Sequence, residues 1–120
     1  MQPVAIHHVS VNVSDVEAGI AFYKDMLGGS MRDDRPDFSF GGAWIDFGPS
    51  QVHLIEGQVP ASLGQHFAVQ VQDLDTTVAE LRSRGATVSD PVPVGPNRQA
   101  FLNDPDGNTV ELHEVGAATR

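Results

Sequence analysis

The sequence contains no cysteine, and this absence limits the chemistry open to the protein. Disulfides, thiolate metal sites and cysteine nucleophiles are all excluded. Any metal must therefore be held by histidine nitrogen and carboxylate oxygen, which directs attention to the five histidines. The lack of cysteine also fits a cytoplasmic protein, and the cytoplasm is the location that we expect.

Positive charge is scarce, with 7 Lys and Arg against 16 Asp and Glu, which gives a formal charge of −9. The cations are scattered along the chain, so we expect no nucleic-acid partner. No apolar run reaches the roughly 18 residues needed to cross a membrane, and the first residues lack the pattern of a signal peptide. We therefore expect no membrane partner, and the length of 120 residues suits one compact domain.

An internal repeat is present at an offset of 58 residues. Without gaps, the offset aligns His8 with His66 and Asp15 with Asp73. Apolar and acidic residues near the end of each copy match as well, as in Glu56 and Glu114. We therefore predict one domain over residues 1–120 that contains two modules, one over about 4–57 and the other over about 64–116.

Each module is predicted to have the order βαβββ. Polar and apolar residues alternate over 8–13, which is the pattern of a strand with two unlike faces. Asp15 and Asp73 are suitable N-caps for the helices that follow. The further strands are expected at 30–32, 40–47 and 51–56, and at 87–90, 98–103 and 109–114, with an irregular loop at 91–96. The predicted class is α+β, with helices on one face of a curved, largely antiparallel sheet that cups a metal site.

Four potential metal ligands are related in pairs by the repeat. His8 matches His66, and His53 matches Glu111. The apolar neighbours of His53 and Glu111 should face the helices, so all four side chains should lie on the opposite, concave side. Imidazole nitrogen and carboxylate oxygen bind Ni, Zn, Fe, Mn or Co. We expect one divalent metal per site and leave its identity open.

Other side chains are candidates for binding a substrate. Arg98 is the cation nearest to the second-module ligands, so it either holds an anionic group or lies in an exposed loop. His113 shares the face of Glu111 and lies beside the metal ligands or at the rim of the cavity, whereas His7 is treated as structural. The residues that either line an apolar substrate wall or belong to the ordinary core are Trp44, Phe38, Phe40 and Phe101.

Three stretches carry a resemblance to a known family. VSVNVSDVEAGIAFYKDMLGG follows His8, FAVQVQDLDTTVAELRSRGA follows His66, and FLNDPDGNTVELHE lies near the C-terminus. Together they resemble the vicinal oxygen chelate superfamily, which includes glyoxalase I, extradiol dioxygenases and bleomycin-binding proteins. The resemblance covers nearly the whole chain and implies His8, His66 and Glu111 as metal ligands. It places His53 at the remaining ligand position, which is Glu in many glyoxalases.

The resemblance also implies what the site does. We expect a glyoxalase-like lyase or isomerase that acts on a small molecule whose vicinal oxygens chelate the metal. Glu111 would move a proton between adjacent carbons, and His53 is the second candidate for this catalytic role. The resemblance further implies a homodimer whose sites are shared between chains.

Two departures from glyoxalase I keep other functions open. His53 stands at a position where a carboxylate is expected, and Asn12 replaces the Arg that glyoxalase I uses for glutathione. Glutathione is therefore not implied as a partner. The alternatives are a single-domain extradiol-type dioxygenase and a non-catalytic, resistance-type protein that binds a small molecule.

Overall fold

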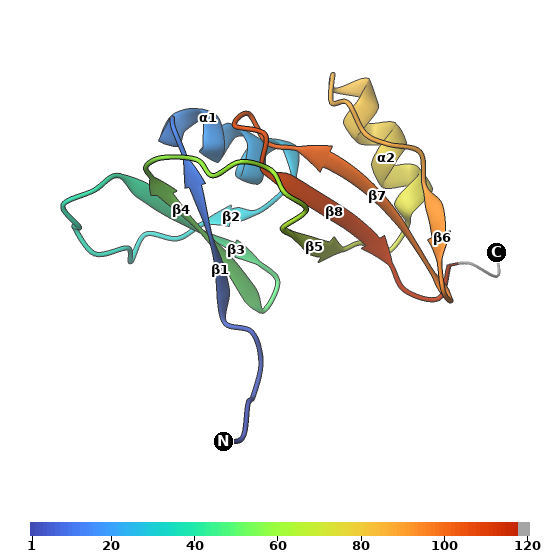
Figure 1. The fold of residues 1–120 in the computed structure, drawn as a ribbon, viewed down its shortest axis with the longest axis horizontal. Coiled ribbons are helices and arrows are strands. Elements are labelled where there is room, and N and C mark those ends of the chain that lie inside the picture. Colours follow the sequence, from blue (N-terminus) through green and yellow to red (C-terminus); the bar gives the residue numbers. More distant parts are fainter. Residues whose placement is uncertain (118–120) are drawn as a thin grey trace. The chain divides into compact units, whose positions relative to one another are not determined.

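A computed structural model describes residues 1–117 of the chain. The chain divides into two compact units, one over Met1–Ala61 and the other beginning at Ser62. Each unit holds one four-stranded sheet with helix packed on one side (Figure 1). Within the described residues, no helix is long and apolar enough to cross a membrane.

The first unit is built around the sheet β1-β4-β3-β2. β1 runs parallel to β4, and the other neighbours are antiparallel, so the sheet is mixed. The α-helix continues directly into a π-helix, so the two form one continuous helical segment. The elements are β1 (His8–Val13), α1 (Val16–Ile20), the π-helix η1 (Ala21–Met26), β2 (Ser30–Met31), β3 (Gly42–Phe47) and β4 (Ser50–Glu56).

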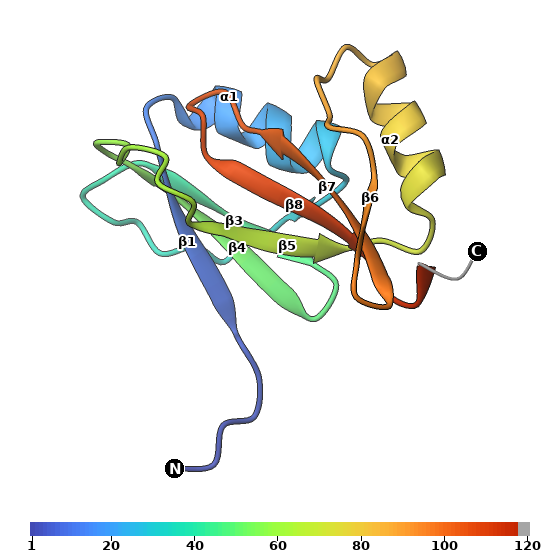
Figure 2. The ribbon, with the colours of Figure 1, turned by 45° about the vertical axis from the view of Figure 1, so that its right-hand side comes forward.

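The second unit repeats this plan in the sheet β5-β8-β7-β6. β5 is parallel to β8, the other pairs are antiparallel, and α2 packs against β7 and β8 (Figure 2). The predicted α+β class and the two tandem βαβββ modules are thus confirmed, with a separate mixed sheet in each module. The elements are β5 (His66–Gln70), α2 (Leu74–Ser83), β6 (Val92–Val94), β7 (Asn97–Asn103) and β8 (Thr109–Glu114).

The two helices begin at equivalent positions of the repeat. Asp15 accepts a hydrogen bond from the backbone N–H of Ala18 at 3.2 Å, and Asp73 accepts one from Thr76 at 3.0 Å. Each aspartate thereby satisfies an amide that the first helical turn leaves without an intrahelical partner. The N-caps predicted from the sequence are confirmed in both modules.

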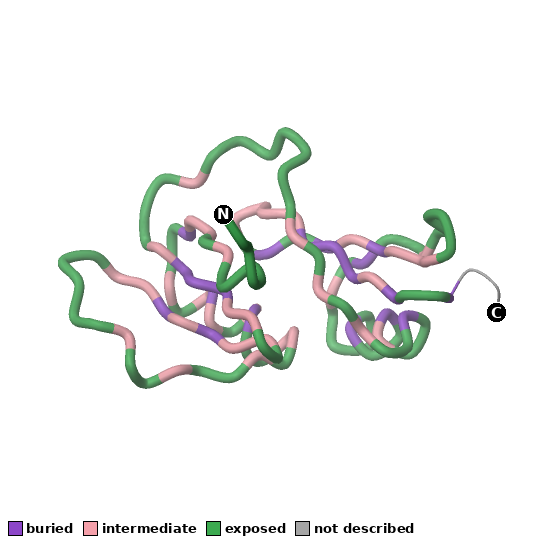
Figure 3. The backbone as a smooth tube through the Cα atoms, turned by 90° about the horizontal axis from the view of Figure 1, so that it is seen from below, coloured by how far each residue is buried: buried purple, intermediate pink, exposed green. Residues whose placement is uncertain are grey.

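One face of each sheet forms the core beneath its helix. In the first unit Ile45 and Leu54 are almost fully buried, and in the second Val110 and Leu112 are. Figure 3 colours the buried residues of both units purple. The period of two along a strand turns every second side chain to the opposite face, so His53 and Glu111, which are also buried, lie on the other face. The apolar faces predicted for 52–54 and 110–112 are therefore the helix-covered ones.

The segment before β7 differs from the prediction. The strand expected at 87–90 does not form, and β6 lies within the stretch that we expected to be an irregular loop. Ser89 does meet β7, because its backbone N–H donates to the carbonyl oxygen of Phe101 at 2.9 Å. Its hydroxyl, and not its backbone carbonyl, accepts the N–H of Phe101 at 2.8 Å, so the ladder does not continue. Pro93 is tolerated in β6 because this strand lies at the sheet edge, where a missing N–H is harmless.

Candidate functional site

The strand registers place the predicted ligands on the helix-free face of each sheet. In the first unit His53 is paired with Ser10 of β1, and His8 is paired with Gln51 of β4. In the second unit Glu111 is paired with Ala68 of β5 in the same way. Paired residues point to the same side of a sheet, so His8 and His53 share one face. By the same rule His66 and Glu111 share the equivalent face of the second sheet.

Three rings are stacked on the first face. The His53 ring lies 4.0 Å from the ring of His8 and 4.4 Å from that of Trp44, with interplanar angles of 13° and 11°. Trp44 lies directly opposite His53 in the register of β3 and β4. The sequence leaves Trp44 open between a substrate wall and the core, and the register places it on the face that carries His53. His53 is buried between the two rings, with 8% of its surface exposed.

Gln51 determines which nitrogen of His53 carries the proton. The Nε2 atom of His53 lies 2.7 Å from Oε1 of Gln51. Because the amide oxygen can only accept, Nε2 donates and Nδ1 keeps the lone pair. Burial, followed by the neighbouring charge of His8, lowers the pKa of His53. The ring is therefore held neutral at neutral pH, which is the form that a metal ligand or a general base requires.

The second face brings two acceptor atoms close together. Nδ1 of His66 donates to the carbonyl oxygen of Gly64 at 2.9 Å. In the neutral ring Nε2 therefore carries the lone pair, and it lies 3.1 Å from Oε1 of Glu111. Two acceptors at this distance repel each other unless a proton or a cation lies between them. Histidines that bind metals typically donate their other N–H to a carbonyl or a carboxylate, as His66 does here.

His113 holds the second oxygen of the same carboxylate. Its Nδ1 lies 2.6 Å from Oε2 of Glu111, a residue that is 8% exposed. The carbonyl of Gly64, and then Glu111, raise the pKa of His66. His113 thus contacts a predicted ligand, one of the two placements that the sequence left open for it.

The predicted substrate residues divide between the two faces. Phe101 lies opposite Glu111 in the register of β7 and β8, and its ring meets that of His66 edge-on at 5.5 Å. Phe40 is exposed in the loop before β3 and stacks on Phe38 at 5.1 Å. Phe38 in turn lies 6.3 Å from Trp44. Trp44 and Phe101 therefore lie beside predicted ligands, one in each unit, and Phe38 and Phe40 lie beyond Trp44.

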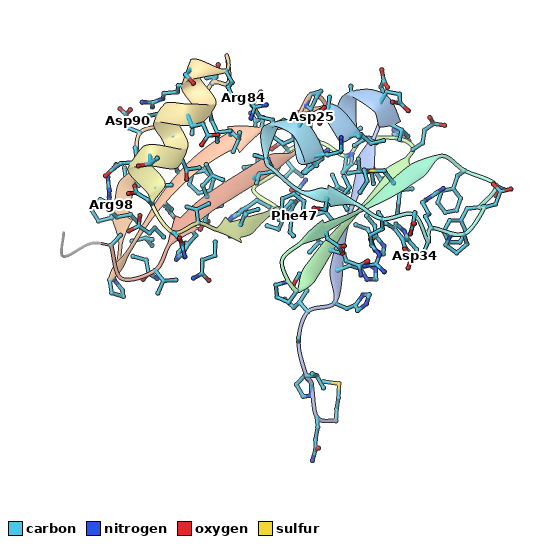
Figure 4. All side chains as sticks on the ribbon, turned by 180° about the vertical axis from the view of Figure 1, so that it is seen from behind. Asp25, Asp34, Phe47, Arg84, Asp90 and Arg98 are labelled. Carbon is cyan, nitrogen blue, oxygen red and sulfur yellow. The ribbon has the colours of Figure 1, made fainter. Side chains whose placement is uncertain are left out.

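Arg98 is not beside the predicted ligands, and this part of the prediction is corrected. In β7 it is paired with Glu114, which places it on the helix-covered side of the sheet. Its Nη1 lies 2.9 Å from Oδ2 of Asp75, and Figure 4 shows it next to α2. This ion pair raises the pKa of Arg98 and uses its charge within the fold. Parity along β7 relates Arg98 to Ala100 and Leu102, and these are core residues.

Two residues near the first face were not identified from the sequence. Gln51 lies two positions before His53 on the same strand, so the strand period could have shown that both share a face. Arg35 lies in the loop between β2 and β3, where no periodicity operates. Its guanidinium is 4.9 Å from the ring centre of Phe38 and 5.6 Å from that of Phe40.

The donors suit a divalent metal, although each face supplies only part of a coordination shell. Among residues 1–117, no three His, Asp or Glu side chains come together as a group that could hold a metal ion. The second face nevertheless offers Nε2 of His66 and Oε1 of Glu111, a nitrogen and an oxygen that lie 3.1 Å apart. Such donors suit the divalent metals expected from the sequence.

Comparison with known proteins gives a consistent set of relatives. Residues 5–112 match the family model "Glyoxalase/Bleomycin resistance protein/Dioxygenase superfamily". A probable lactoylglutathione lyase of Synechocystis is 32% identical, over 92% of this chain and 95% of the relative. The lactoylglutathione lyase of Salmonella typhimurium is 29% identical, over 94% of both chains. The chain spans less than half the length of the plant relatives that it matches. One of them, lactoylglutathione lyase GLX1 of Arabidopsis thaliana, is 32% identical over 91% of this chain and 44% of the relative.

Solved structures show the same fold. A glyoxalase family protein from Bacillus anthracis aligns with a TM-score of 0.87 and 26% identity, over 96% of this chain and 98% of that one. TnmS3, an antibiotic-binding protein from Streptomyces sp. CB03234, aligns with a TM-score of 0.78 and 26% identity, over the same shares of the two chains. The fold is thus shared by a glyoxalase family protein and by an antibiotic-binding protein.

Proposed function

Because the chain belongs to the Glyoxalase/Bleomycin resistance protein/Dioxygenase superfamily, we propose that it is a divalent-metal-dependent lyase or isomerase of the glyoxalase type. Its substrate is a small molecule that chelates the metal through two vicinal oxygens. The observation that carries the proposal is the contact of His66 Nε2 with Glu111 Oε1 at 3.1 Å. A divalent cation can bind these two atoms in place of the proton that they share in the metal-free protein.

The proposed ligands are His8 and His53 from the first unit and His66 and Glu111 from the second. His66 is supported by its N–H to the Gly64 carbonyl, which directs the other ring nitrogen toward Glu111. His53 is supported by its burial and its neutral ring. The identity of the metal stays open among Ni, Zn, Fe, Mn and Co, and the homodimer with shared sites and the cytoplasmic location stay predictions.

Glu111 is the proposed base that moves a proton between two adjacent carbons of the substrate. When bound, the metal supplies a Lewis acid that stabilises the negative charge developing on the substrate oxygens. His113 holds Oε2 of Glu111 at 2.6 Å, so this side chain fixes the orientation of the carboxylate. His53, neutral and with Nδ1 unprotonated, is the second group that can accept a proton. Trp44 and Phe101 are the rings that contact His53 and His66 on the two faces.

Glutathione is not proposed as the thiol partner. Asn12 lies where glyoxalase I carries an arginine, and its Nδ2 donates to the backbone carbonyl of Gln58 at 2.9 Å. A neutral amide engaged with the chain cannot supply the charge that the arginine would. The lactoylglutathione lyase relatives thus support the reaction type more strongly than the substrate.

Two other functions remain as alternatives. A non-catalytic binding protein is favoured by the likeness to TnmS3 and by the exposed rings of Phe38 and Phe40. A single-domain extradiol-type dioxygenase would use His8, His66 and Glu111 as ligands of Fe²⁺ or Mn²⁺. In that case His53 would stay off the metal and serve as an acid or base near dioxygen.

The three functions can be separated on the purified protein. Metal content is measured first, together with the binding of added Ni²⁺, Zn²⁺ and Fe²⁺. Isomerisation of methylglyoxal adducts with several thiols under Ni²⁺ or Zn²⁺ supports the lyase, and oxygen uptake with catechols under Fe²⁺ supports the dioxygenase. Metal and ligand binding without turnover supports the binding protein. A protein that binds none of the three metals overturns the metal-dependent proposal.

A further inference from the structure

Arg35 differs from the other cations of the described chain in the partners it has. The side chains of Lys24, Arg32, Arg82 and Arg98 each form an ion pair with an aspartate. Within residues 1–117, Arg35 forms no ion pair, although Asp33 and Asp37 lie in the same loop. Its charge is therefore not used by a carboxylate of the fold.

The guanidinium of Arg35 is nevertheless held in place. It lies over the rings of Phe38 and Phe40, and its Nη2 donates to the carbonyl oxygen of Phe40 at 2.8 Å. Contacts between a cation and an aromatic face stabilise this arrangement. Gly42 leaves room for the guanidinium, because a Cβ atom at position 42 would lie 2.9 Å from Nη2 of Arg35. One donor group is used by the carbonyl, and further N–H groups of the fork stay available.

The same rings connect Arg35 with the proposed metal ligands. Phe38 lies 6.3 Å from Trp44, and the Trp44 ring is stacked on His53 at 4.4 Å. A series of ring contacts thus leads from the guanidinium to His53, with the Phe38 and Trp44 rings tilted by 54° to each other. Its outer part is exposed at Phe38 and Phe40 (39% and 44%). Figure 4 labels Asp34 in the same loop between β2 and β3. Asp34 is itself paired with Arg32 at 2.7 Å.

We propose that Arg35 binds an anionic group, a carboxylate or a phosphate, of a substrate whose aromatic or other flat apolar part lies on Phe38, Phe40 and Trp44. The planar fork matches the oxygens of either group and can bind them through two parallel hydrogen bonds. The proposal rests on the proposed function where it assigns the bound molecule to the metal site. It gives Arg35 the role that the sequence suggested for Arg98.

Trp44 supplies a direct signal for the test, because it is the only tryptophan of the chain. Metal-free protein is titrated with benzoate, phenyl phosphate and the neutral benzyl alcohol while the Trp44 fluorescence is recorded. We expect both anions to bind more tightly than benzyl alcohol, and the tighter of the two anions identifies the group. Arg35→Gln should weaken the better anion about tenfold and leave benzyl alcohol unchanged. Arg35→Lys should restore part of the affinity, because it keeps the charge but not the fork.

Arg82→Gln is the matched control. Arg82 pairs with Asp90 in the second unit, and it is far in the sequence from the rings of Phe38, Phe40 and Trp44. It should bind all three probes as the wild type does. Equal affinity for benzoate, phenyl phosphate and benzyl alcohol, or equal loss of all three in Arg35→Gln, overturns the role of Arg35.

A second titration separates this inference from the metal site. Metal-loaded protein is titrated with catechol and with 3,4-dihydroxybenzoate, which adds a carboxylate to the same vicinal oxygens. We expect the second probe to bind about tenfold more tightly, and the preference to vanish in Arg35→Gln. Catechol that binds equally with and without metal overturns the chelation part of the proposed function, while the first titration still decides on Arg35.

Discussion

Trp44 and His53 lie directly opposite each other on β3 and β4, and their rings are stacked at 4.4 Å. His8 covers the other side of the His53 ring at 4.0 Å. An imidazole between two rings has little rotational freedom, and its Nε2 is fixed by Gln51. This arrangement keeps His53 oriented and neutral, which is a reason to place it in the proposed chemistry and not only in the core.

We predict that His53→Ala affects activity more strongly than metal content. Removing one of four proposed ligands weakens the metal site, but His8, His66 and Glu111 still provide a three-ligand set. Activity also loses a proton acceptor, which typically contributes about 10²- to 10⁴-fold. Metal analysis and turnover are measured on the same preparation. Full activity in a variant that retains its metal would remove His53 from the mechanism.

His66→Ala should lose most of its metal. The variant lacks Nε2, the donor that faces Oε1 of Glu111 in the wild type. We expect metal affinity to fall by more than about 100-fold, which is the upper end of what the loss of a supporting contact costs. His113→Gln should show a smaller loss, because His113 contacts only the carboxylate.

Gln70→Ala is the matched control for His66→Ala, since Gln70 is exposed on the same strand and the same face as His66. Its metal affinity should be that of the wild type. Unchanged metal content in His66→Ala would contradict the ligand assignment, whatever the control shows.

Glu111→Gln should lower the pKa of His66 in the metal-free protein. The carbonyl of Gly64 is the larger cause of the raised pKa and stays in the variant, whereas the negative charge of Glu111 is lost. A raised pKa in the folded state stabilises the fold below the pKa of the unfolded chain, and this contribution disappears as pH rises through the folded pKa. NMR titration of the His66 ring measures the change. A pKa of His66 that is the same in both proteins would show that the carboxylate has no part in it.

The sequence is enough to predict which side chains share a face of each sheet, because this follows from the periodicity of the strands. The offset that aligns His8 with His66 also aligns the strands, the N-caps Asp15 and Asp73, and the ligand positions. A period of two along β4 then determines that His53 faces away from Val52 and Leu54. Such properties depend on local geometry, and a single sequence is enough to predict them.

The contacts of irregular segments follow no such rule. The place of Arg98 in the chain leaves both a role in holding an anionic group and an exposed loop position open, whereas the register of β7 places it toward α2 and Asp75. Arg35 reaches Phe38 and Phe40 through a loop whose path depends on packing, so no spacing in the sequence indicates it. Ser89 meets β7 through one backbone hydrogen bond and one bond to its hydroxyl, a mixed contact that a strand propensity does not describe.

Arg98→Gln should leave metal binding and activity unchanged. The ion pair with Asp75 lies on the helix side of β7, and Asp75 is largely exposed, so the loss of stability should be small. Urea unfolding and metal titration of the variant are the measurements. A selective loss of affinity for anionic substrates would instead return Arg98 to the site.

Gly42→Ala should destabilise the first unit, because a Cβ atom at this position would lie 2.2 Å from the backbone oxygen of Leu54. Relief of this clash requires β3 and β4 to separate, since a backbone carbonyl cannot rotate away. We expect a loss of about 1–3 kcal/mol in the free energy of unfolding, as for other overpacked sites. Chemical denaturation followed by Trp44 fluorescence measures it, since Trp44 lies two residues further along β3.

Gly41→Ala is the neighbouring control. Its Cβ atom would approach only the carboxyl group of Glu56, at 3.3 Å, and this exposed side chain can turn toward solvent. The change in stability should stay within about 0.5 kcal/mol, the usual range for surface substitutions. If both alanine variants were equally stable, the close approach of β3 to β4 could not be the reason for glycine at position 42. The remaining explanation would then be the room that Gly42 leaves for the Arg35 guanidinium.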